Sequence, residues 1–298
     1  MNEKSIIRIG PAGWSYGDWE GIVYPKEKSR GFDQLEFMAR YFDTIEINTT
    51  FYRPATIKMT ESWVRRTAHN PRFKFTAKLW QKFTHERQDF STHDQKIFKE
   101  GITPLVDSKK LGALLVQFPW SFKNEEVNKN WIFRIFDEFQ EYPLVVEFRH
   151  QSWANEGVYS VLRERGIGFA NIDQPVIGKS VKPSTNVTSE IGYVRFHGRN
   201  YETWFQKGAG RDARYNYLYS DKETEEWIKR IKDIEKKANK NYFIYNNHFK
   251  GQAVANSLQL MAKLSGEKVR APESLIQEYP ELKSIAKVDS PGEELSLF

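Results

Sequence analysis

The sequence contains no cysteine. The chain can therefore form no disulfide bond, no thiolate metal site and no cysteine nucleophile, and this composition is typical of an intracellular protein. No apolar run approaches the roughly 20 residues that a membrane-spanning helix needs. The N-terminal stretch MNEKSIIRIG continues directly into a strand pattern and does not resemble a signal peptide. We therefore expect a cytoplasmic protein that does not cross a membrane.

Two motifs and one kind of segment are also missing. GPAG at residues 10–13 lacks the G-x-G-x-x-G spacing, and the aromatic stretch WSYGDW follows it in place of a helix start, so this is not a dinucleotide fingerprint. The metal-binding motif H-E-x-x-H is absent. No low-complexity linker divides the chain into separate domains.

The residues that are present suit one sizeable, basic domain. Hydrophobic residues make up 39% of the 298 positions and aromatic residues 15%, which is enough for a large core. The formal net charge is +6. This charge has two interpretations, which are simple solubility and a preference for anionic ligands such as phosphates or nucleic acid.

Apolar strand patterns and helical patterns alternate along the chain. The expected strands are Ile6–Gly10, Thr44–Asn48, Phe73–Lys78, Ala113–Phe118, Leu144–Arg149, Ile167–Asp173, Tyr193–His197 and Tyr242–Asn246. The expected helices are Asp33–Phe42, Met59–His69, Thr92–Leu105, Glu125–Phe139, Gly157–Arg165, Asp221–Lys237 and Gly251–Leu264. Asp33 and Asp221 are the predicted N-caps of two of these helices.

This alternation predicts an α/β protein with a parallel sheet and crossover helices. Eight strands in this length favour a closed TIM-type β/α barrel over an open, doubly wound sheet. The interval 174–190 is rich in Pro, Gly, Ser and Thr and has no helical stripe, so we expect a loop in place of the outer helix between strands six and seven. Residues 1–270 are then a single barrel domain, and 271–298 form a short helix and a polar tail.

Polar side chains gather where the predicted strands end. In LVVEFRHQSW, at residues 144–153, an apolar strand ends with Glu147, Arg149 and His150, and Trp153 follows. Residues two apart share one face of a strand, and barrel enzymes place their catalytic groups at the carboxyl ends of the strands. The side chains with this parity are Glu46, Asn48, Thr76, Lys78, Gln117, Glu147, Arg149, Asn171, Asp173, Arg195, His197, Asn246 and His248. We expect them to converge at one mouth, although the charges would also be explained if they only pair to fill the upper layer of the barrel.

The chain also resembles a known family, and the motifs GPAGWSYGDWEGIVYP, EINTTFYR, FKFTAK, LLVQFPWSF, VVEFRHQSW, YVRFHGRN and FIYNNHFKGQAVANS carry the resemblance in this order. They are similar to the YecE-like family, a domain of unknown function (72), over about residues 6–262. The resemblance implies a TIM-barrel-like fold and implies no established reaction. Its recurrent positions correspond to Glu46, Asn48, Phe51, Tyr52, Lys78, Gln117, Glu147, Arg149, His150, Trp153, Asp173, Arg195, His197, Gly198, Asn246 and Asn247.

The predicted mouth has the residue types needed for acid–base chemistry on an anion. The candidate catalytic residues are Glu46, Glu147, Asp173 and His197. The candidate substrate-binding residues are Asn48, Tyr52, Lys78, Gln117, Arg149, His150, Trp153, Arg195, Asn246 and Asn247. We predict no cofactor. A divalent metal is the alternative, since carboxylates and histidines are available, but the interleaved cations would repel it unless an anionic substrate neutralised them.

The segment after strand seven is long, basic and aromatic, with Arg199, Trp204, Lys207, Arg211, Arg214, Tyr215 and Tyr217. Together with Trp14, Tyr16, Trp19, Phe51, Tyr52 and Trp153 it is a candidate wall of the mouth that stacks on bases or sugar rings; a packed lid with solvated charges is the alternative. We therefore predict an enzyme of the hydrolase, lyase or isomerase type that acts on an anionic, phosphate-bearing substrate. The alternatives are a nucleic-acid or nucleotide binding protein without turnover, and a metal-dependent phosphoesterase or nuclease. The sequence indicates no membrane partner and identifies no protein partner.

Overall fold

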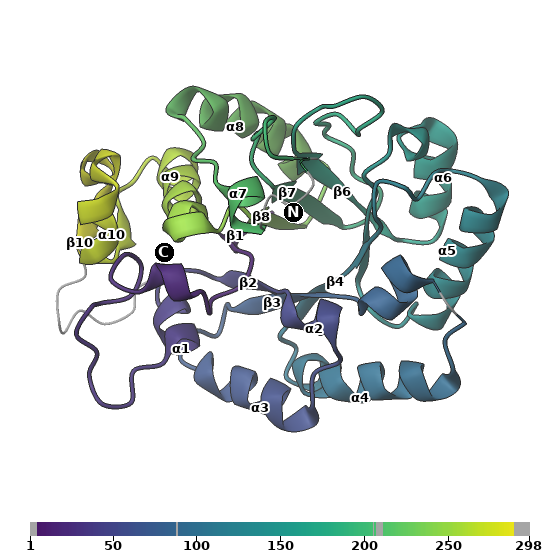
Figure 1. The fold of residues 1–298 in the computed structure, drawn as a ribbon, viewed down its shortest axis with the longest axis horizontal. Helices are drawn as coiled ribbons and strands as arrows, with labels where there is room; N and C mark the ends of the chain where they lie inside the picture. Colours follow the sequence, from purple (N-terminus) through teal and green to yellow (C-terminus); the bar gives the residue numbers. More distant parts are fainter. Residues whose placement is uncertain (1–4, 88, 205, 207–210, 289–298) are drawn as a thin grey trace.

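The structure is a computed structural model that describes residues 5–87, 89–204, 206 and 211–288. Eight parallel strands form a nearly closed barrel surrounded by helices, which confirms the predicted fold class (Figure 1). The strands are β1 (Ile6–Pro11), β2 (Thr44–Ile47), β3 (Lys74–Lys78), β4 (Leu111–Gln117), β5 (Leu144–Glu147), β6 (Gly168–Asp173), β7 (Ile191–Phe196) and β8 (Lys240–Tyr245). Their order in the sheet is β1-β8-β7-β6-β5-β4-β3-β2.

The barrel closes where β1 approaches β2. Ala12 and Glu46 form an isolated parallel bridge, and the amide of Gly13 donates a hydrogen bond to the carbonyl oxygen of Glu46 at 2.8 Å. Gly10 makes this approach possible, because a Cβ atom at that position would lie 2.0 Å from the carbonyl oxygen of Thr44. The seam therefore depends on a glycine in β1 and brings Glu46 to the upper edge of the barrel.

The predicted helices are all present around the strands (Figure 1). They are α1 (Gln34–Met38), α3 (Ile57–Arg66), α4 (Thr92–Asp107), α5 (Glu126–Glu138), α6 (Glu156–Glu164), α8 (Asp221–Glu235) and α9 (Gln252–Ser265). The short additional helices are α2 (Thr49–Tyr52), α7 (Arg211–Tyr215), α10 (Glu273–Glu278) and the single turns η1 (Gly17–Trp19), η2 (Lys82–Glu86), η3 (Gln151–Trp153), η4 (Phe249–Gly251) and η5 (Pro280–Ser284). The interval 174–190, described throughout, contains no helix, so a loop does replace the outer helix between β6 and β7.

One of the two predicted helix caps is correct. Asp33 caps α1, since its carboxylate accepts a hydrogen bond from the amide of Glu36. The prediction for Asp221 is wrong by one position, because Ser220 caps α8 in a reciprocal capping box with Glu223. A hydroxyl followed three residues later by a glutamate satisfies two amides at once, and this favours starting the helix one residue earlier.

Side-chain alternation divides the core into an inner and an outer layer. The inside of the barrel is filled by an apolar cluster of Ala12, Ala113, Leu115, Val145, Ala170, Ile191, Tyr193, Tyr242 and Ile244. The intervening residues pack outward against the helices in two larger clusters. Following β5 and β7 upward from Val145 and Tyr193, the next inward positions are Glu147 and Arg195, so the apolar filling ends in a charged layer.

Strand β6 has the opposite parity to the one predicted. Ala170 belongs to the inner cluster, so Asn171 and Asp173 point outward. Asn171 donates to the carbonyl oxygen of Asn186 and accepts from Ser184 in the loop that replaces the missing helix. The loop therefore provides polar partners on a face that an outer helix would have made apolar, and the expectation that Asp173 lies inside the mouth is wrong.

The chain ends in a small extension beside α9 (Figure 1). Strands β9 (Val269–Ala271) and β10 (Ala286–Val288) pair in parallel and enclose α10 and η5. Leu275 and Leu282 are fully buried and join the main core, so this part packs onto the barrel. The predicted short helix is α10, and the predicted polar tail from residue 289 onward lies outside the described residues. Over the described residues, no helix has the length and apolar character required to cross a membrane.

Candidate functional site

A buried guanidinium joins two carboxylates at the carboxyl end of the barrel. Arg195 on β7 donates from Nη1 to Glu147 on β5 and from Nη2 to Glu46 on β2, both at 2.6 Å. Arg195 is 1% exposed and the two glutamates are 0% exposed. We call Glu46, Lys78, Glu147, Arg149, Arg195 and His197 the inner cluster, because all six come from the predicted mouth residues and lie together inside the barrel.

Two uncharged side chains, Tyr193 and Thr76, lie below this pair of carboxylates. The Tyr193 hydroxyl lies 3.0 Å from Glu46 Oε2 and 2.9 Å from Thr76 Oγ1. Burial and the charge of Glu46 raise the pKa of Tyr193 well above its ordinary value, so its hydroxyl keeps its proton and donates to the carboxylate. With Arg195 on one oxygen and Tyr193 on the other, Glu46 is held in one orientation.

Arg149 continues the cluster toward the surface. Its Nε donates to Glu147 Oε1 at 2.5 Å and its Nη1 donates to Gln174 Oε1 at 2.6 Å. Its guanidinium carbon lies 5.9 Å from the ring centre of Trp204. Nη2 makes no hydrogen bond to any described residue. Arg149 therefore fixes Glu147 with one side of its planar group and has a free donor on the other.

Burial and the arginines together set the charge states of Glu147 and His197. Burial opposes ionisation of Glu147, but Arg149 and Arg195 outweigh it and hold the pKa of this carboxyl well below its usual range. Burial, reinforced by Arg149, lowers the pKa of His197 well below its ordinary value. At neutral pH the cluster therefore contains an ionised Glu147 beside a neutral His197.

Hydrogen bonding also selects the tautomer of His197. The amide nitrogen of Asn246 lies 3.1 Å from His197 Nδ1 and donates to it, so the ring proton is on Nε2. Nε2 faces Glu147 Oε1 at 3.6 Å, beyond ordinary hydrogen-bond distance, and has no hydrogen-bond partner among the described residues. His197 thus presents a buried, unsatisfied N–H inside the mouth.

Lys78, the last residue of β3, is another group of the inner cluster without a hydrogen-bond partner in the described residues. Its side chain is 8% exposed, and its Nζ lies 4.1 Å from the ring centre of Phe51. The ammonium makes no hydrogen bond or ion pair within the part of the chain that the structure describes. Burial, with the positive charge of Arg195, lowers its pKa to about 7. Lys78 is therefore divided between its charged and neutral forms at physiological pH.

The ion pairs of the inner cluster explain why Lys78 has no carboxylate partner. Glu46 and Glu147 carry two negative charges, and Arg149 and Arg195 carry two positive charges. The charges of these four groups cancel, and the two arginines bind the carboxylate oxygens that face the cluster. Lys78 adds a positive charge that nothing in the described cluster neutralises when it is protonated.

Asp173 belongs to a different cluster outside the barrel, which we call the outer cluster and which comprises Asp173, Arg199, Glu223 and Trp227. Arg199 donates to Asp173 from Nε at 2.9 Å and from Nη2 at 2.8 Å. The indole of Trp227 on α8 also donates to Asp173. Arg199 completes its bonding with Glu223 at 3.2 Å. This cluster fastens the start of the 198–220 segment to α8, so Asp173 is placed as a structural carboxylate.

Several predicted binding residues lie away from the inner cluster. Trp153 stacks on Phe148 at a centroid distance of 4.4 Å, in the layer of outer helices, and donates to the carbonyl oxygen of Phe122. His150 bonds to Ser152 in the same turn. Asn247 donates to Tyr217 and Asn256, which joins the 198–220 segment to α9. These three placements give no support to substrate contact.

The remaining predicted residues lie nearer the mouth. Asn48 and Gln117 are partly exposed at the ends of β2 and β4, and Tyr52 is 60% exposed on α2. Trp204 and Tyr215 lie 6.3 and 6.5 Å from His197, between ring centres, so part of the predicted aromatic wall is present. Trp19 is buried and bonds to the carbonyl oxygen of His248 instead. Lys207 and the side chain of Arg211 lie outside the described residues.

Sequence reasoning missed three contributors. Tyr193 was overlooked because it lies below the strand end, Gln174 because it opens a loop, and His85 because it lies in η2. The parity rule extended two positions down β7 would have found Tyr193. His85 stands edge-on to Phe51 at 4.8 Å, and burial and the charge of Lys78 lower its pKa to about 4. It is therefore a second neutral imidazole near the mouth.

The described carboxylates and histidines are not arranged for the alternative of a divalent metal. No group of three or more His, Asp or Glu side chains is placed to hold a metal ion in the described residues. Glu46 and Glu147, the nearest carboxylates, already accept from arginine.

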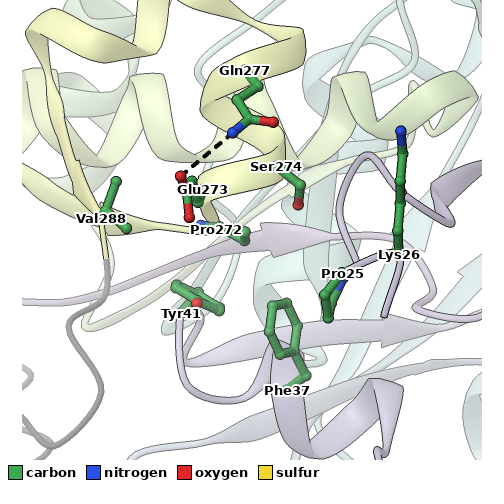
Figure 2. Close-up of a pocket in the computed structure, with 10 residues that line it drawn as sticks. Pro25, Lys26, Phe37, Tyr41, Pro272, Glu273, Ser274, Gln277 and Val288 are labelled. Carbon is green, nitrogen blue, oxygen red and sulfur yellow. Dashed lines mark hydrogen bonds between the residues drawn. The ribbon is translucent and has the colours of Figure 1, made fainter. Parts of the chain in front are cut away.

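Figure 2 shows a cavity of about 400 Å³ in another part of the molecule. It lies between the N-terminal loop and α1 on one side and the C-terminal extension on the other, with Phe37, Tyr41 and Pro272 in its lining. A hydrogen bond from Gln277 to Glu273 runs along α10 at the edge of this cavity. None of the inner cluster residues lines it, and its charged groups, Lys26 and Glu273, are exposed. This cavity does not have the buried charges of the barrel mouth.

The fold and the cluster together define a TIM-type β/α barrel with its polar groups gathered at the carboxyl ends of the strands. The chain belongs to the family described as protein of unknown function DUF72, whose model matches residues 8–280. It is 30% identical to the UPF0759 protein YunF of Bacillus subtilis over 276 residues, which cover 88% of this chain and 96% of YunF.

Solved structures of the same family have the same fold. A DUF72 family protein of Thermotoga maritima matches with a TM-score of 0.76 and 32% identity, over 87% of this chain and 99% of that one. A DUF72 family protein of Enterococcus faecalis matches with a TM-score of 0.76 and 26% identity, over 87% and 96% of the two chains. These relatives support the barrel and assign no reaction to it.

Proposed function

We propose that this protein is an enzyme that carries out acid–base chemistry on a small anionic substrate at the carboxyl end of the barrel. One observation carries the proposal. Lys78 is 8% exposed and its Nζ makes no hydrogen bond to the described residues, and the buried Nε2 of His197 has no partner among them either. Buried polar groups are nearly always satisfied in folded proteins, so a pair of unsatisfied donors in one cluster is the mark of a site that a ligand completes.

The charge pattern favours an enzyme over a protein that only binds anions. A binder needs cations and has no use for carboxylates in its site, yet Glu147 lies between Arg149 and Arg195 and is ionised by them. Lys78, whose pKa is about 7, is suited to accept or donate a proton near neutral pH. The inner cluster thus combines a fixed negative charge, a neutral imidazole donor and one titrating amine.

Arg149 is the group best placed to hold the anionic part of the substrate. Its Nη2 is free of hydrogen bonds to the described residues, while its other two nitrogens are fixed by Glu147 and Gln174. A guanidinium that is already oriented loses little further entropy when it binds an anion. Arg195, in contrast, has both terminal nitrogens committed and acts by positioning the two glutamates.

The roles follow from these constraints. Arg149 binds the anionic group, Lys78 exchanges a proton with the reacting atom, and His197 donates a hydrogen bond to the oxygen on which charge develops. Glu147 stays ionised and orients Arg149 and Arg195. A reaction that needs neutral Lys78 as a base should have a rate that rises with pH up to about 7 and is constant above it.

The test separates binding from turnover. Anion binding is measured by thermal shift and calorimetry with inorganic phosphate, glyoxylate and glycolaldehyde phosphate, and turnover is screened with phosphosugars and hydroxy acids by NMR. Arg149→Met should weaken binding of each anion that binds the parent, by about tenfold or more for a lost charge-assisted hydrogen bond. Lys78→Met should abolish turnover and leave binding within about threefold, which a simple binder would not reproduce.

Arg165→Met is the matched control, because Arg165 is a surface arginine paired with Asp137 on the outside of the barrel. It should change neither binding nor turnover. Equal anion affinities of the parent and Arg149→Met would contradict the assignment of the anion site. A Lys78→Met variant with the full turnover of the parent would contradict the role of Lys78.

A further inference from the structure

We propose that Lys78 is a nucleophile that forms a covalent imine with the carbonyl carbon of its substrate, so that the substrate class is an anionic aldehyde or ketone. This inference rests on the proposed function for the location of the substrate and adds the chemical identity of its reacting group. The observation behind this inference is that the amine of Lys78 lies against the ring of Phe51, while the neighbouring glutamates are already paired with arginines.

The surroundings of Lys78 differ from those of a structural lysine. A lysine at the end of a barrel strand normally places its ammonium on a carboxylate or on carbonyl oxygens. Here Nζ rests over the face of Phe51, and both neighbouring glutamates are held by arginines. An aromatic face attracts a cation but accepts no ordinary hydrogen bond, so the nitrogen lone pair is free for bond formation when the amine is neutral.

Burial beside the arginines also supplies the reactive form. With a pKa of about 7, roughly half of Lys78 is unprotonated at pH 7, against about one part in three thousand for a lysine with the ordinary pKa of 10.5. The low exposure of the side chain, 8%, limits the access of water that would hydrolyse an imine.

The reaction balances without any other reagent. The lone pair of Nζ attacks the carbonyl carbon and forms the C–N bond, and the carbonyl oxygen takes up one proton. Loss of the hydroxyl group as water breaks the C–O bond and uses the second proton from the amine, so the products are an imine and one water molecule. His197 Nε2–H is the cluster's neutral donor for the developing alkoxide, and the charges of Arg149 and Arg195 stabilise negative charge there.

Other partly buried lysines provide an internal comparison. Lys110 also has a lowered pKa, caused by burial and by Lys74, but its Nζ donates to the carbonyl oxygens of Thr67 and Asn70 at 2.9 and 3.2 Å. Lys82 is paired with Asp94 at 2.7 Å. The ammonium groups of Lys110 and Lys82 both have acceptors, whereas that of Lys78 has none in the described residues.

The experiment is reductive trapping on the intact, full-length protein. The protein is incubated at pH 7 with glyoxylate or with uncharged glycolaldehyde, in the presence of sodium cyanoborohydride, and modified lysines are quantified by peptide mass spectrometry over time. We expect Lys78 to be modified at least about ten times faster than Lys110 or Lys82. Lys78→Arg, which keeps a positive charge and removes the nucleophile, should abolish this fast phase, and Lys82→Arg should leave it intact.

Modification of Lys78 no faster than Lys110 in the parent protein would overturn the proposal, and this comparison needs no variant to fold. Arg149→Met separates it from the proposed function. Because Arg149 also stabilises the alkoxide and helps to lower the pKa of Lys78, this variant should slow trapping of both probes, but if Arg149 holds the anion it should slow trapping with glyoxylate by a larger factor than trapping with glycolaldehyde. Fast trapping that is equal for both probes and indifferent to Arg149→Met would support the nucleophile while refuting the anion site.

Discussion

The molecule contains two buried carboxylate–arginine clusters that differ in one respect. In the outer cluster Asp173 accepts from Arg199 and Trp227, and Arg199 also reaches Glu223, so the charged groups are satisfied by one another. In the inner cluster the glutamates are paired with arginines as well, but Lys78, Arg149 Nη2, Arg195 Nε and His197 Nε2 have no hydrogen-bond partner within the described residues.

The difference shows that a buried ion pair alone does not mark a functional site. Burial of Glu147 and of Asp173 is equally complete, and each has arginine as a partner. The outer cluster joins the 198–220 segment to α8 and has no donor to spare. Of the two, the inner cluster leaves donors without a partner among the described residues, and substitutions should separate the two accordingly.

The largest effect is expected from Arg195→Met. It leaves Glu46 and Glu147 buried side by side without the guanidinium between them, and the free energy of unfolding should fall by about 3–5 kcal/mol. Denaturant unfolding at pH 7 measures it, with the exposed Arg165→Met as control. A loss below about 1 kcal/mol would mean that the glutamates are not ionised partners of Arg195.

The next largest effect should have the opposite sign. Lys78→Met replaces an amine whose charged form is disfavoured by burial with an apolar side chain of similar length, and it should raise the free energy of unfolding by about 2–4 kcal/mol at pH 7. Thermal and urea unfolding of the parent and the variant provide the measurement. A destabilised Lys78→Met protein would show that Lys78 has a stabilising partner and would remove the contrast between the two clusters.

Asp173→Asn should have a smaller effect, because Arg199 is partly exposed and keeps Glu223 as a partner. We expect the free energy of unfolding to fall by about 1–3 kcal/mol. Trapping of Lys78 by glyoxylate should keep the rate of the parent protein, since no side-chain hydrogen bond joins the two clusters in the described residues and the substitution keeps the backbone bond from the His197 amide to the Asp173 carbonyl oxygen. A trapping rate reduced tenfold in a folded Asp173→Asn protein would show that the two clusters act together.

The smallest effect, taken per pH unit, is a change in the pH dependence of stability. The pKa of Lys78 is about 7 in the folded chain and near 10.5 when unfolded, so between these values the unfolded chain binds more protons. Stability should therefore rise with pH in this window, by at most about 1.4 kcal/mol per unit, and the gain from Lys78→Met should shrink as pH increases from 7 to 9.5. A gain that is constant over this range would contradict the lowered pKa.

His197 affects the free energy of unfolding in a lower pH range, in which stability falls as the pH falls. Its pKa is lowered in the folded state, so the unfolded chain takes up the extra proton as pH falls below about 6.5, and stability is lost on acidification. In urea unfolding, His197→Gln should make the free energy of unfolding depend less steeply on pH below about 6.5. Its dependence on pH above 7 should stay as in the parent protein. A steep dependence at acid pH that persists in the variant would assign it to other groups.

Strand alternation was sufficient to predict most of the inner cluster. In β2, β3, β5 and β7 one face is apolar throughout, so the polar residues of the other parity were assigned to the mouth correctly, among them Glu46, Lys78 and Arg195. In β6 the rule failed. Its residues are mostly apolar or small on both faces, and polar partners for Asp173 come from α8 and Arg199, which periodicity does not reveal.

The rest depends on distances between distant parts of the chain. The sequence shows three cations and two glutamates at the mouth but not which cations take the carboxylates, so the isolation of Lys78 could not be predicted. Trp153 was misplaced for a simpler reason. It follows the strand by several residues, where side chains no longer alternate, and its ring packs on Phe148 in the outer layer.

The ion pairs of Arg195 also have a consequence for how the chain folds. Arg195 and Glu46 are 149 residues apart in sequence, so their contact forms only when the first and last parts of the barrel meet. A chain that has assembled only its second half already holds Glu147, Arg149 and Arg195, with an excess of one positive charge. Glu46 arrives with β2 and cancels that charge, so sealing the barrel and completing the charge balance of the site are the same event.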